Sequence, residues 1–215
     1  MALNKSKGNM YDFISHTWNV IKGKCYHNCS YCYMKRWDNL KPVRFDEKEL
    51  KTDLGNNNFI FVGSSCDMFA NNIPNDWIYS TLNYMQSFNN HYLLQSKNPK
   101  RFKDFWNWND GTIKYCTTIE TNRFYPHIIK ESPRPDERVF EYLDYITVEP
   151  IMDFDLYYLI KFLKMCKPIQ INIGADSGNN HLPEPPKGKI QELIKELGEF
   201  TKVKLKKNLN RLLNE

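Results

Sequence analysis

Residues 24–33 read KCYHNCSYCY and place half of the six cysteines of this 215-residue chain within eight positions. Cys25, Cys29 and Cys32 have the spacing C-x3-C-x2-C. Three thiolates on one short loop are able to hold a single metal centre. The remaining cysteines are scattered along the chain, which is typical of thiols that only pack in a core.

Two kinds of metal centre remain open for this loop. Iron–sulfur clusters usually have four thiolate ligands, so three would leave one iron free for a substrate or cofactor. A structural zinc site needs a fourth Cys or His, which His27 or His16 would supply. Zinc sites favour paired C-x2–4-C knuckles. The spacing therefore favours an iron–sulfur cluster and keeps zinc as the alternative.

Outward from this loop, short apolar runs alternate with longer amphipathic segments. The apolar runs predict strands at 17–23, 59–63, 91–95, 113–119, 145–148 and 169–173. Helices are predicted at 76–88, 100–108, 154–165 and 189–197, and 203–206 fits either a strand or more helix. Apolar strands separated by helices form parallel sheets. We expect an α/β fold, a partial (β/α)6 TIM-like barrel with a parallel sheet and outer helices.

The length predicts one domain over 1–215, with a core at about 17–178 and a C-terminal helix and possible extra strand over 187–215. No run of about 18 apolar residues is present, and the first ten residues lack a hydrophobic signal core. We therefore expect a cytoplasmic protein that has no membrane partner. The net charge of +5 permits an anionic partner such as nucleic acid without requiring one.

In parallel barrels, functional residues gather at the carboxyl ends of the strands. The candidates at these ends are Gly63, Ser64, Ser65, Cys66, Lys97, Glu120, Asn122, Glu149 and Gly174. Simpler interpretations exist for them. Lys97 and Glu120 would be an exposed ion pair, Gly174 a turn glycine, and Cys66 a small buried side chain.

The cysteine loop, with the aromatic Tyr31 before its last cysteine, resembles the signature of the radical S-adenosylmethionine (radical-SAM) superfamily. Other runs occur in the order expected for a family of small, phage-associated radical-SAM proteins of unassigned function. These runs are WN (18–19), FVGSSCDMF (61–69), QSKNPKR (95–101), TIETN (118–122), TVEP (147–150) and IGADSG (173–178). The resemblance spans about residues 18–178.

The resemblance implies that Cys25, Cys29 and Cys32 hold a [4Fe–4S] cluster. The open iron would bind the amino and carboxylate groups of S-adenosylmethionine (SAM). An external electron donor of the flavodoxin or ferredoxin type would reduce the cluster. Cleavage of SAM would then yield a 5′-deoxyadenosyl radical that abstracts hydrogen from the substrate, so the cofactor supplies the difficult chemistry.

The resemblance also implies roles around the sulfonium cofactor. The superfamily usually has a Gly-Gly-Glu run where this chain has Gly63, Ser64 and Ser65. Without that Glu, serine hydroxyls or backbone carbonyls would accept the ammonium protons. Lys97 would pair with the cofactor carboxylate, and Tyr31 would lie on the adenine side of the loop.

The other strand ends complete this implied site. Glu120 and Asn122 would hold the ribose hydroxyls or the ammonium. Glu149 would face the barrel mouth, and Gly174 would leave room for adenine. Cys66 would return a hydrogen atom to a substrate radical, as a cysteine does in spore photoproduct lyase, which the chain resembles distantly.

Aromatic and basic residues near the predicted mouth would suit a nucleobase and its phosphates. They are Trp37, Trp106, Trp108, Phe124 and Tyr125, with Arg36, Lys100, Arg101, Lys103 and Arg123. Ordinary packing explains them equally well. Three hypotheses follow: a radical-SAM enzyme acting on nucleic acid or a nucleotide, one acting on a peptide or small metabolite, and a zinc-stabilised nucleic-acid-binding module without catalysis.

Overall fold

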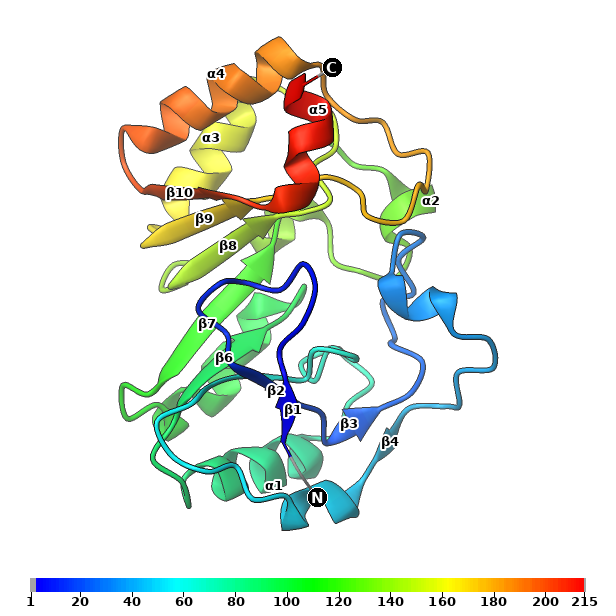
Figure 1. Ribbon diagram of the computed structural model, residues 1–215, viewed down its shortest axis with the longest axis vertical. Coiled ribbons are helices and arrows are strands. Elements are labelled where there is room, and N and C mark those ends of the chain that lie inside the picture. Colours follow the sequence, from blue (N-terminus) through cyan, green and yellow to red (C-terminus); the bar gives the residue numbers. More distant parts are fainter. Residues whose placement is uncertain (1–2, 215) are drawn as a thin grey trace.

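The computed structural model describes residues 3–214, in which a large sheet has the strand order β1-β2-β5-β6-β7-β8-β9-β10 (Figure 1). Its strands are β1 Asn4–Lys5, β2 His16–Trp18, β5 Phe59–Val62, β6 His91–Gln95, β7 Ile113–Thr118, β8 Tyr145–Val148, β9 Gln170–Ile173 and β10 Lys202–Leu205. A small second sheet pairs β3 (Ile21–Lys22) with β4 (Arg44–Phe45).

All neighbouring strands from β2 to β10 are parallel, and β1 runs antiparallel to β2. The expected α/β fold with a partial TIM-like barrel is therefore confirmed. The segment 203–206, for which strand and helix were both left open, largely coincides with β10 at 202–205, which adds a seventh parallel strand. The single strand predicted at 17–23 is wrong. Its first half joins the large sheet as β2, and its second half turns away as β3 to pair with β4.

Helices connect the strands and cover one face of the sheet (Figure 1). The α-helices are α1 Asn75–Met85, α2 Pro126–Ile129, α3 Leu156–Met165, α4 Lys187–Gly198 and α5 Asn210–Asn214. The 3-10 helices are η1 Tyr33–Arg36, η2 Glu47–Lys51, η3 Pro99–Trp108, η4 Pro135–Arg138 and η5 Lys207–Leu209. The helix predicted at 100–108 is thus a 3-10 helix. No helix within residues 3–214 has the length and apolar character needed to cross a membrane.

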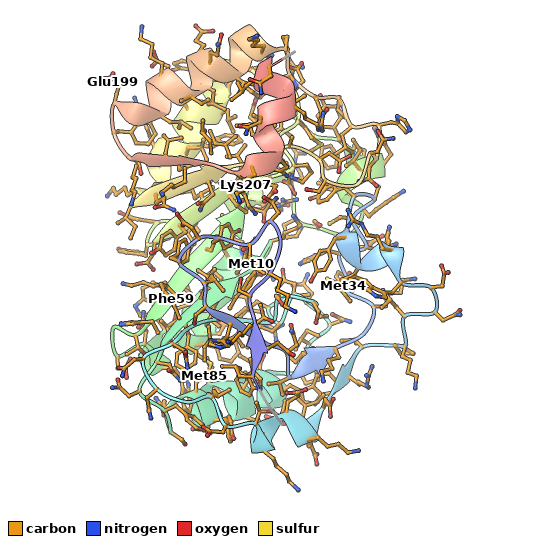
Figure 2. All side chains as sticks on the ribbon, viewed as in Figure 1. Met10, Met34, Phe59, Met85, Glu199 and Lys207 are labelled. Carbon is orange, nitrogen blue, oxygen red and sulfur yellow. The ribbon has the colours of Figure 1, made fainter. Side chains whose placement is uncertain are left out.

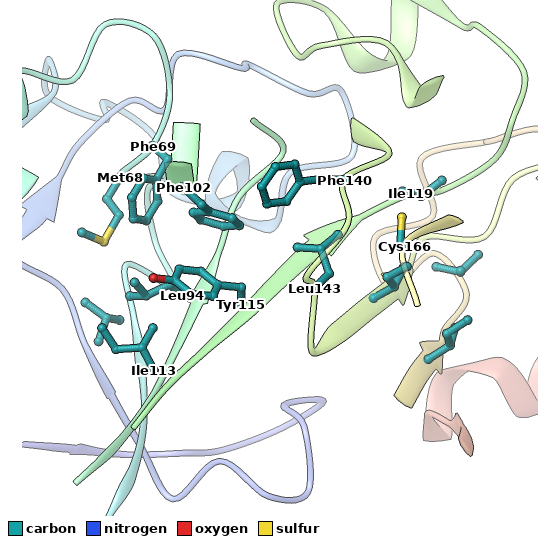
Figure 3. Close-up of a cluster of buried hydrophobic side chains, with 14 of the residues drawn as sticks. Met68, Phe69, Leu94, Phe102, Ile113, Tyr115, Ile119, Phe140, Leu143 and Cys166 are labelled. Carbon is teal, nitrogen blue, oxygen red and sulfur yellow. The ribbon is translucent and has the colours of Figure 1, made fainter. Parts of the chain in front are cut away.

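The main core lies between the sheet and these helices. Alternate strand residues such as Ile60 and Val62 point into it, because successive strand side chains face opposite sides of a sheet. Apolar residues at helical spacing, such as Leu159 and Leu163 of α3, meet them. Figure 3 shows the part around Phe69, Phe102 and Tyr115, whose rings are buried.

The opposite face of the sheet is covered by the N-terminal segment between β1 and β2 (Figure 1). Tyr11 and Ile14 are buried there, and they pack with Leu93 of β6 and Cys116 of β7. Phe13 stacks on Tyr145 of β8 at a centroid distance of 4.7 Å. The segment fills the concave side of the partial barrel, so the space left for a ligand lies at the ends of the strands.

Candidate functional site

A pocket of about 950 Å³ opens at the carboxyl ends of β5, β6, β8 and β9. Its wall includes Met10 of the N-terminal segment and Met34 of η1, both of which are labelled in Figure 2. Ligand sites in proteins are usually about 300–1,000 Å³. The pocket is therefore large enough for a cofactor together with part of a substrate.

The three clustered cysteines all line this pocket, on the loop between β3 and η1. Cys29 is buried, whereas Cys25 and Cys32 are half-buried. Two tight backbone turns shape the loop, since Asn28 N donates to Cys25 O and Cys32 N to Cys29 O. Ser30 N donates to Ile128 O at 2.8 Å and anchors the loop on α2.

Cys66 lies on the pocket wall beside this loop and is only 3% exposed. A hydrogen bond between the two thiols lowers the pKa of Cys25 and raises the pKa of Cys66. Burial raises the pKa of the Cys32 thiol. The role of Cys66 as a hydrogen-atom donor remains a prediction.

The donor set suits a cluster better than a single ion. Among residues 3–214, no three His, Cys, Asp or Glu side chains converge as ligands of one metal ion. Each thiolate of a [4Fe–4S] cluster binds a different iron, so its ligands face a shared space rather than one point. The three cysteines line one pocket, as the ligands of a shared cluster would. The alternative zinc ligand His27 bonds Asp67 through Nε2, and His16 does not line the pocket.

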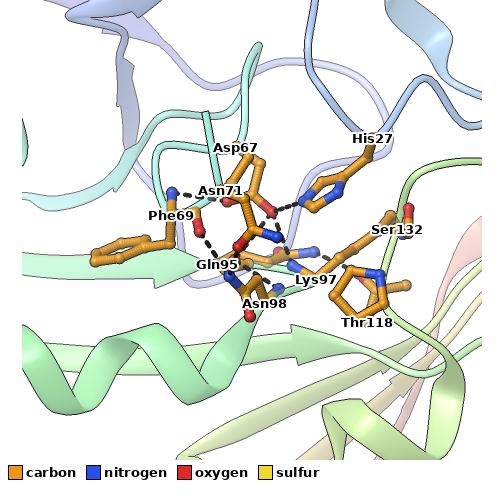
Figure 4. A network of polar contacts seen from close by, with 12 residues as sticks. His27, Asp67, Phe69, Asn71, Gln95, Lys97, Asn98, Thr118 and Ser132 are labelled. Carbon is orange, nitrogen blue, oxygen red and sulfur yellow. Dashed lines mark hydrogen bonds and ion pairs between the residues drawn. The ribbon is translucent and has the colours of Figure 1, made fainter. Parts of the chain in front are cut away.

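Asp67, which was not a predicted site residue, ties the cysteine loop to two strand ends (Figure 4). Its Oδ2 accepts hydrogen bonds from His27 Nε2 at 2.8 Å, Ser96 Oγ at 3.0 Å and the backbone N–H of Lys97 at 2.8 Å. Burial alone would raise the pKa of Asp67, but the charge and hydrogen bond of His27 lower it below its ordinary value. The carboxylate therefore fixes the loop against the ends of β5 and β6.

The turn after β5 presents two serines to the pocket. Gly63 has φ of +78°, and a Cβ there would lie 3.2 Å from Cys66 O, so the turn requires glycine. Asn19 Oδ1 accepts hydrogen bonds from Ser64 Oγ, Ser65 N and Ser65 Oγ at 2.9–3.2 Å. Because both hydroxyls donate to Asn19, their lone pairs stay available as acceptors.

Glu120 does not line the pocket, contrary to the expectation of a direct ligand contact. It is fully buried, and its Oε1 accepts from Tyr31 OH and from Lys97 Nζ at 2.7 Å. Its Oε2 accepts from Arg138 Nη1 at 2.6 Å. Burial would raise the pKa of Glu120, but Arg138 and Lys97 lower it to about 2. Arg138, which the sequence did not single out, is itself fully buried.

Lys97 carries the positive charge of this network to the pocket wall. Its ammonium donates to Tyr31 OH at 2.8 Å and to Glu120 Oε1, which uses two of its three N–H groups. Tyr31 lines the pocket beneath it, with Lys97 Nζ 5.1 Å from the ring centroid. One N–H of Lys97 therefore remains for a ligand.

The remaining strand-end candidates have other partners. Asn122 exchanges hydrogen bonds with Asp155 at the start of α3, away from the pocket. A Cβ at Gly174 would lie 2.6 Å from Glu149 Oε1, so the carboxylate of Glu149 occupies the space predicted for adenine. Glu149 does line the pocket.

The N-terminal segment and the end of β10 supply partners for Glu149 that the sequence did not predict. Glu149 accepts hydrogen bonds from Lys206 Nζ at 2.6 Å, Asn9 Nδ2 at 2.8 Å and Asn208 Nδ2 at 2.9 Å. The apolar residues Met10, Tyr11, Phe13 and Ile14 were the available signal that this N-terminus packs on the fold.

Most of the aromatic and basic residues predicted to bind a nucleobase and its phosphates do not line the pocket. Trp37 and Arg36 line the pocket, but Trp106 stacks on Tyr115 at 4.9 Å. The others serve packing or surface contacts: Trp108 with Tyr79, Lys103 with Phe140, Phe124 with Arg134, Arg101 with Ile73 O, and Arg123 with Asp153 and Asp155. Lys100 and Tyr125 also lie outside the pocket wall.

No family model and no curated protein matches this chain. Solved structures of spore photoproduct lyase do resemble it. A variant with one cysteine replaced by serine aligns with a TM-score of 0.66 at 10% identity, over 92% of this chain and 78% of that one.

Two ligand complexes of the same enzyme align similarly. The complex with dinucleoside spore photoproduct has a TM-score of 0.63 at 9% identity, over 92% of this chain and 78% of that one. A double variant with bound AdoMet and dinucleoside spore photoproduct has a TM-score of 0.64 at 8% identity, over 95% and 80%. The likeness establishes that this chain shares the fold of spore photoproduct lyase.

Proposed function

We propose that this protein is a radical-SAM enzyme in which Cys25, Cys29 and Cys32 hold a [4Fe–4S] cluster. The observation that carries the proposal is that the three thiols line the same pocket as the serine turn after β5 and Lys97 after β6. The fold is that of spore photoproduct lyase, which has been solved with AdoMet. When bound, the cluster and SAM supply a 5′-deoxyadenosyl radical that abstracts hydrogen from the substrate.

The residues of the pocket wall bind and orient the amino-acid end of SAM. Lys97 uses its remaining N–H to hold the carboxylate. Ser64 and Ser65 accept hydrogen bonds from the ammonium group through lone pairs that remain free when their hydroxyls donate to Asn19. Glu120 acts one step behind the pocket, because both of its oxygens are occupied in holding Lys97, Tyr31 and Arg138.

Nucleic acid or a nucleotide is the proposed substrate class, and a flavodoxin or ferredoxin is the proposed electron donor. The substrate proposal is supported by the neighbouring complexes with a dinucleoside lesion and by the exposed Trp37 and Arg36 at the pocket mouth. A peptide or small-metabolite substrate is the alternative. We further propose membership of the small phage-associated radical-SAM proteins, on the sequence runs that resemble them.

Anaerobic reconstitution tests the reaction class. We expect about four irons and four sulfides per chain, no zinc, and 5′-deoxyadenosine when dithionite and SAM are added. Cys25→Ala, Cys29→Ala and Cys32→Ala should each lose iron and SAM cleavage. Cys166→Ala is the matched control, because Cys166 is buried outside the pocket. Full iron loading and cleavage by any of the three loop variants would refute the proposal.

A further inference from the structure

The positive charge of the chain is concentrated beside the pocket. Residues 24–44, here the rim segment, contain five basic residues and one acidic residue, for a net charge of +4. The rest of the chain contains 25 basic and 24 acidic residues, for a net charge of +1. The five cations are Lys24, Lys35, Arg36, Lys41 and Arg44. A field this localised attracts anions to one place on the surface.

These cations are not neutralised by the protein. All five are exposed, and none forms an ion pair within the part of the chain that the structure describes. Lys35 and Arg36 donate only to backbone carbonyls, those of Asn28 and Ser177. Lys22, next to the rim segment, shows the contrast, because it pairs with Asp46 and Glu49.

Large aromatic side chains are interleaved with these cations. Trp37 is 56% exposed, Tyr33 47% and Tyr26 38%. The rings of Tyr33 and Trp37 meet edge to face, with centroids 5.9 Å apart. Exposed aromatic faces next to cations are the features on which single-stranded nucleic acids stack and track their backbone.

The rim segment is fixed across the mouth of the pocket. Tyr33 OH donates to Ser64 O at 2.9 Å after β5, and Arg36 Nη2 donates to Ser177 O at 2.7 Å after β9. Lys24, Lys35 and Trp37 also line the pocket. A polymer held on the rim segment therefore lies directly over the opening.

We propose that the rim segment is a binding surface for single-stranded nucleic acid, with the phosphates along its five cations and bases stacked on Trp37 and Tyr33. Duplex is disfavoured, because its bases are already stacked on one another and are not free to stack on Trp37 and Tyr33. The inference deepens the proposed function by naming the form of its substrate, but the binding itself needs neither cluster nor SAM.

Fluorescence anisotropy with a labelled 20-nucleotide mixed-sequence DNA tests the surface, with the matching duplex as a second probe. For the single strand, the logarithm of the binding constant should fall linearly with the logarithm of the salt concentration. Trp37→Ala should weaken it about 5- to 150-fold, the range for loss of one stacked base, and Trp37→Phe should retain most of it. Replacing Lys35 and Lys41 by Gln should lower the salt slope by about 1 to 2.

Matched controls lie on the outer helices. Tyr157→Ala removes an aromatic side chain that is 73% exposed, and Lys161→Gln with Lys195→Gln removes two exposed cations. These variants should bind like the wild type. Rim variants that bind as tightly as the controls, equal affinity for duplex, or equal displacement by polyglutamate would each overturn the proposal. Loss of binding with intact 5′-deoxyadenosine formation would refute this surface alone, and intact binding without cluster or SAM cleavage would refute the proposed function alone.

Discussion

Replacing Arg138 by Met removes a buried cation that supports the candidate site from behind. Arg138 Nη1 donates to Glu120 Oε2 at 2.6 Å and to Thr118 O at 3.0 Å, and its Nε donates to Pro133 O at 2.7 Å. Methionine keeps part of the apolar chain but leaves Glu120 Oε2 without its partner. The buried carboxylate then depends on Lys97, which also bonds Tyr31.

Breaking a buried ion pair by removing one partner costs about 3–5 kcal/mol. Domains are stable by about 5–15 kcal/mol, so Arg138→Met should lower the urea midpoint clearly, as followed by tryptophan fluorescence. Arg134→Met is the matched control from the same loop. Arg134 is 55% exposed and pairs with Asp136, which is 49% exposed, so its loss should cost about 0–1 kcal/mol. Equal losses for the two variants would refute the buried-pair reasoning.

The same carboxylate predicts a pH dependence. Because the folded-state pKa of Glu120 is depressed from 4.5 to about 2, its stabilisation is complete above about pH 4.5 and is lost as the pH falls towards 2. A depression of this size corresponds to about 3 kcal/mol. The difference in unfolding free energy between wild type and Glu120→Gln should therefore shrink between pH 5 and pH 3. A difference that stays constant with pH would mean that the pKa of Glu120 is not depressed in the folded protein.

Three further predictions concern the packing around the site. Gly174→Ala should lower the free energy of unfolding by about 1–3 kcal/mol, because its Cβ would lie 2.9 Å from Glu149 Cγ. Gly188→Ala in α4, where a Cβ would have nothing within 4 Å, should raise it by about 0.4–1 kcal/mol. Equal urea midpoints for the two variants would contradict this prediction. Tyr11→Phe should cost about 1 kcal/mol in the same assay by removing the 2.8 Å hydrogen bond to Gln95, and exposed Tyr26→Phe should cost nothing measurable. Iodoacetamide at pH 8 should leave Cys116 and Cys166 unmodified in the folded protein. Burial blocks access to both thiols and raises the pKa of each, that of Cys166 to about 11. Rapid labelling of either residue, detected by peptide mass spectrometry, would contradict their burial.

Local sequence was enough to predict most of the sheet. Runs such as 59–62, which read FIFV, are apolar on both faces, which is typical of a strand enclosed in a parallel sheet. The break within 17–23 was not predictable, because it depends on a distant partner: Trp18 O accepts from Gly63 N, after which the chain leaves the large sheet. Strand β1 was also missed, since Asn4 and Lys5 are exposed and polar and gain their pairing only from β2.

The candidate site was also predictable only in part. The cysteine loop was predicted because its three cysteines lie within eight consecutive residues, so their spacing can be read directly from the sequence. The roles of Arg138, Asn19 and Asp67 were missed because their contacts join residues far apart in the chain, such as His27 with Asp67 and Arg138 with Glu120. No local pattern marks a residue whose partner is brought to it by the topology.

Both carboxylate oxygens of Glu120 already accept hydrogen bonds from protein groups, so other residues must bind a ligand in the pocket. With that carboxylate fully engaged, the polar groups that the ends of β5 and β6 offer to a ligand beside the cysteines include one N–H of Lys97 and the lone pairs of Ser64 and Ser65. They follow β6 and β5, which are neighbouring strands about 4.8 Å apart. A donor on one strand end and acceptors on the next suit the carboxylate and ammonium of an α-amino acid, the part of SAM that the open iron would hold. The missing Glu after Gly63 is therefore compatible with the proposed cofactor, because Asn19 turns two serines into the acceptors that such a Glu would provide.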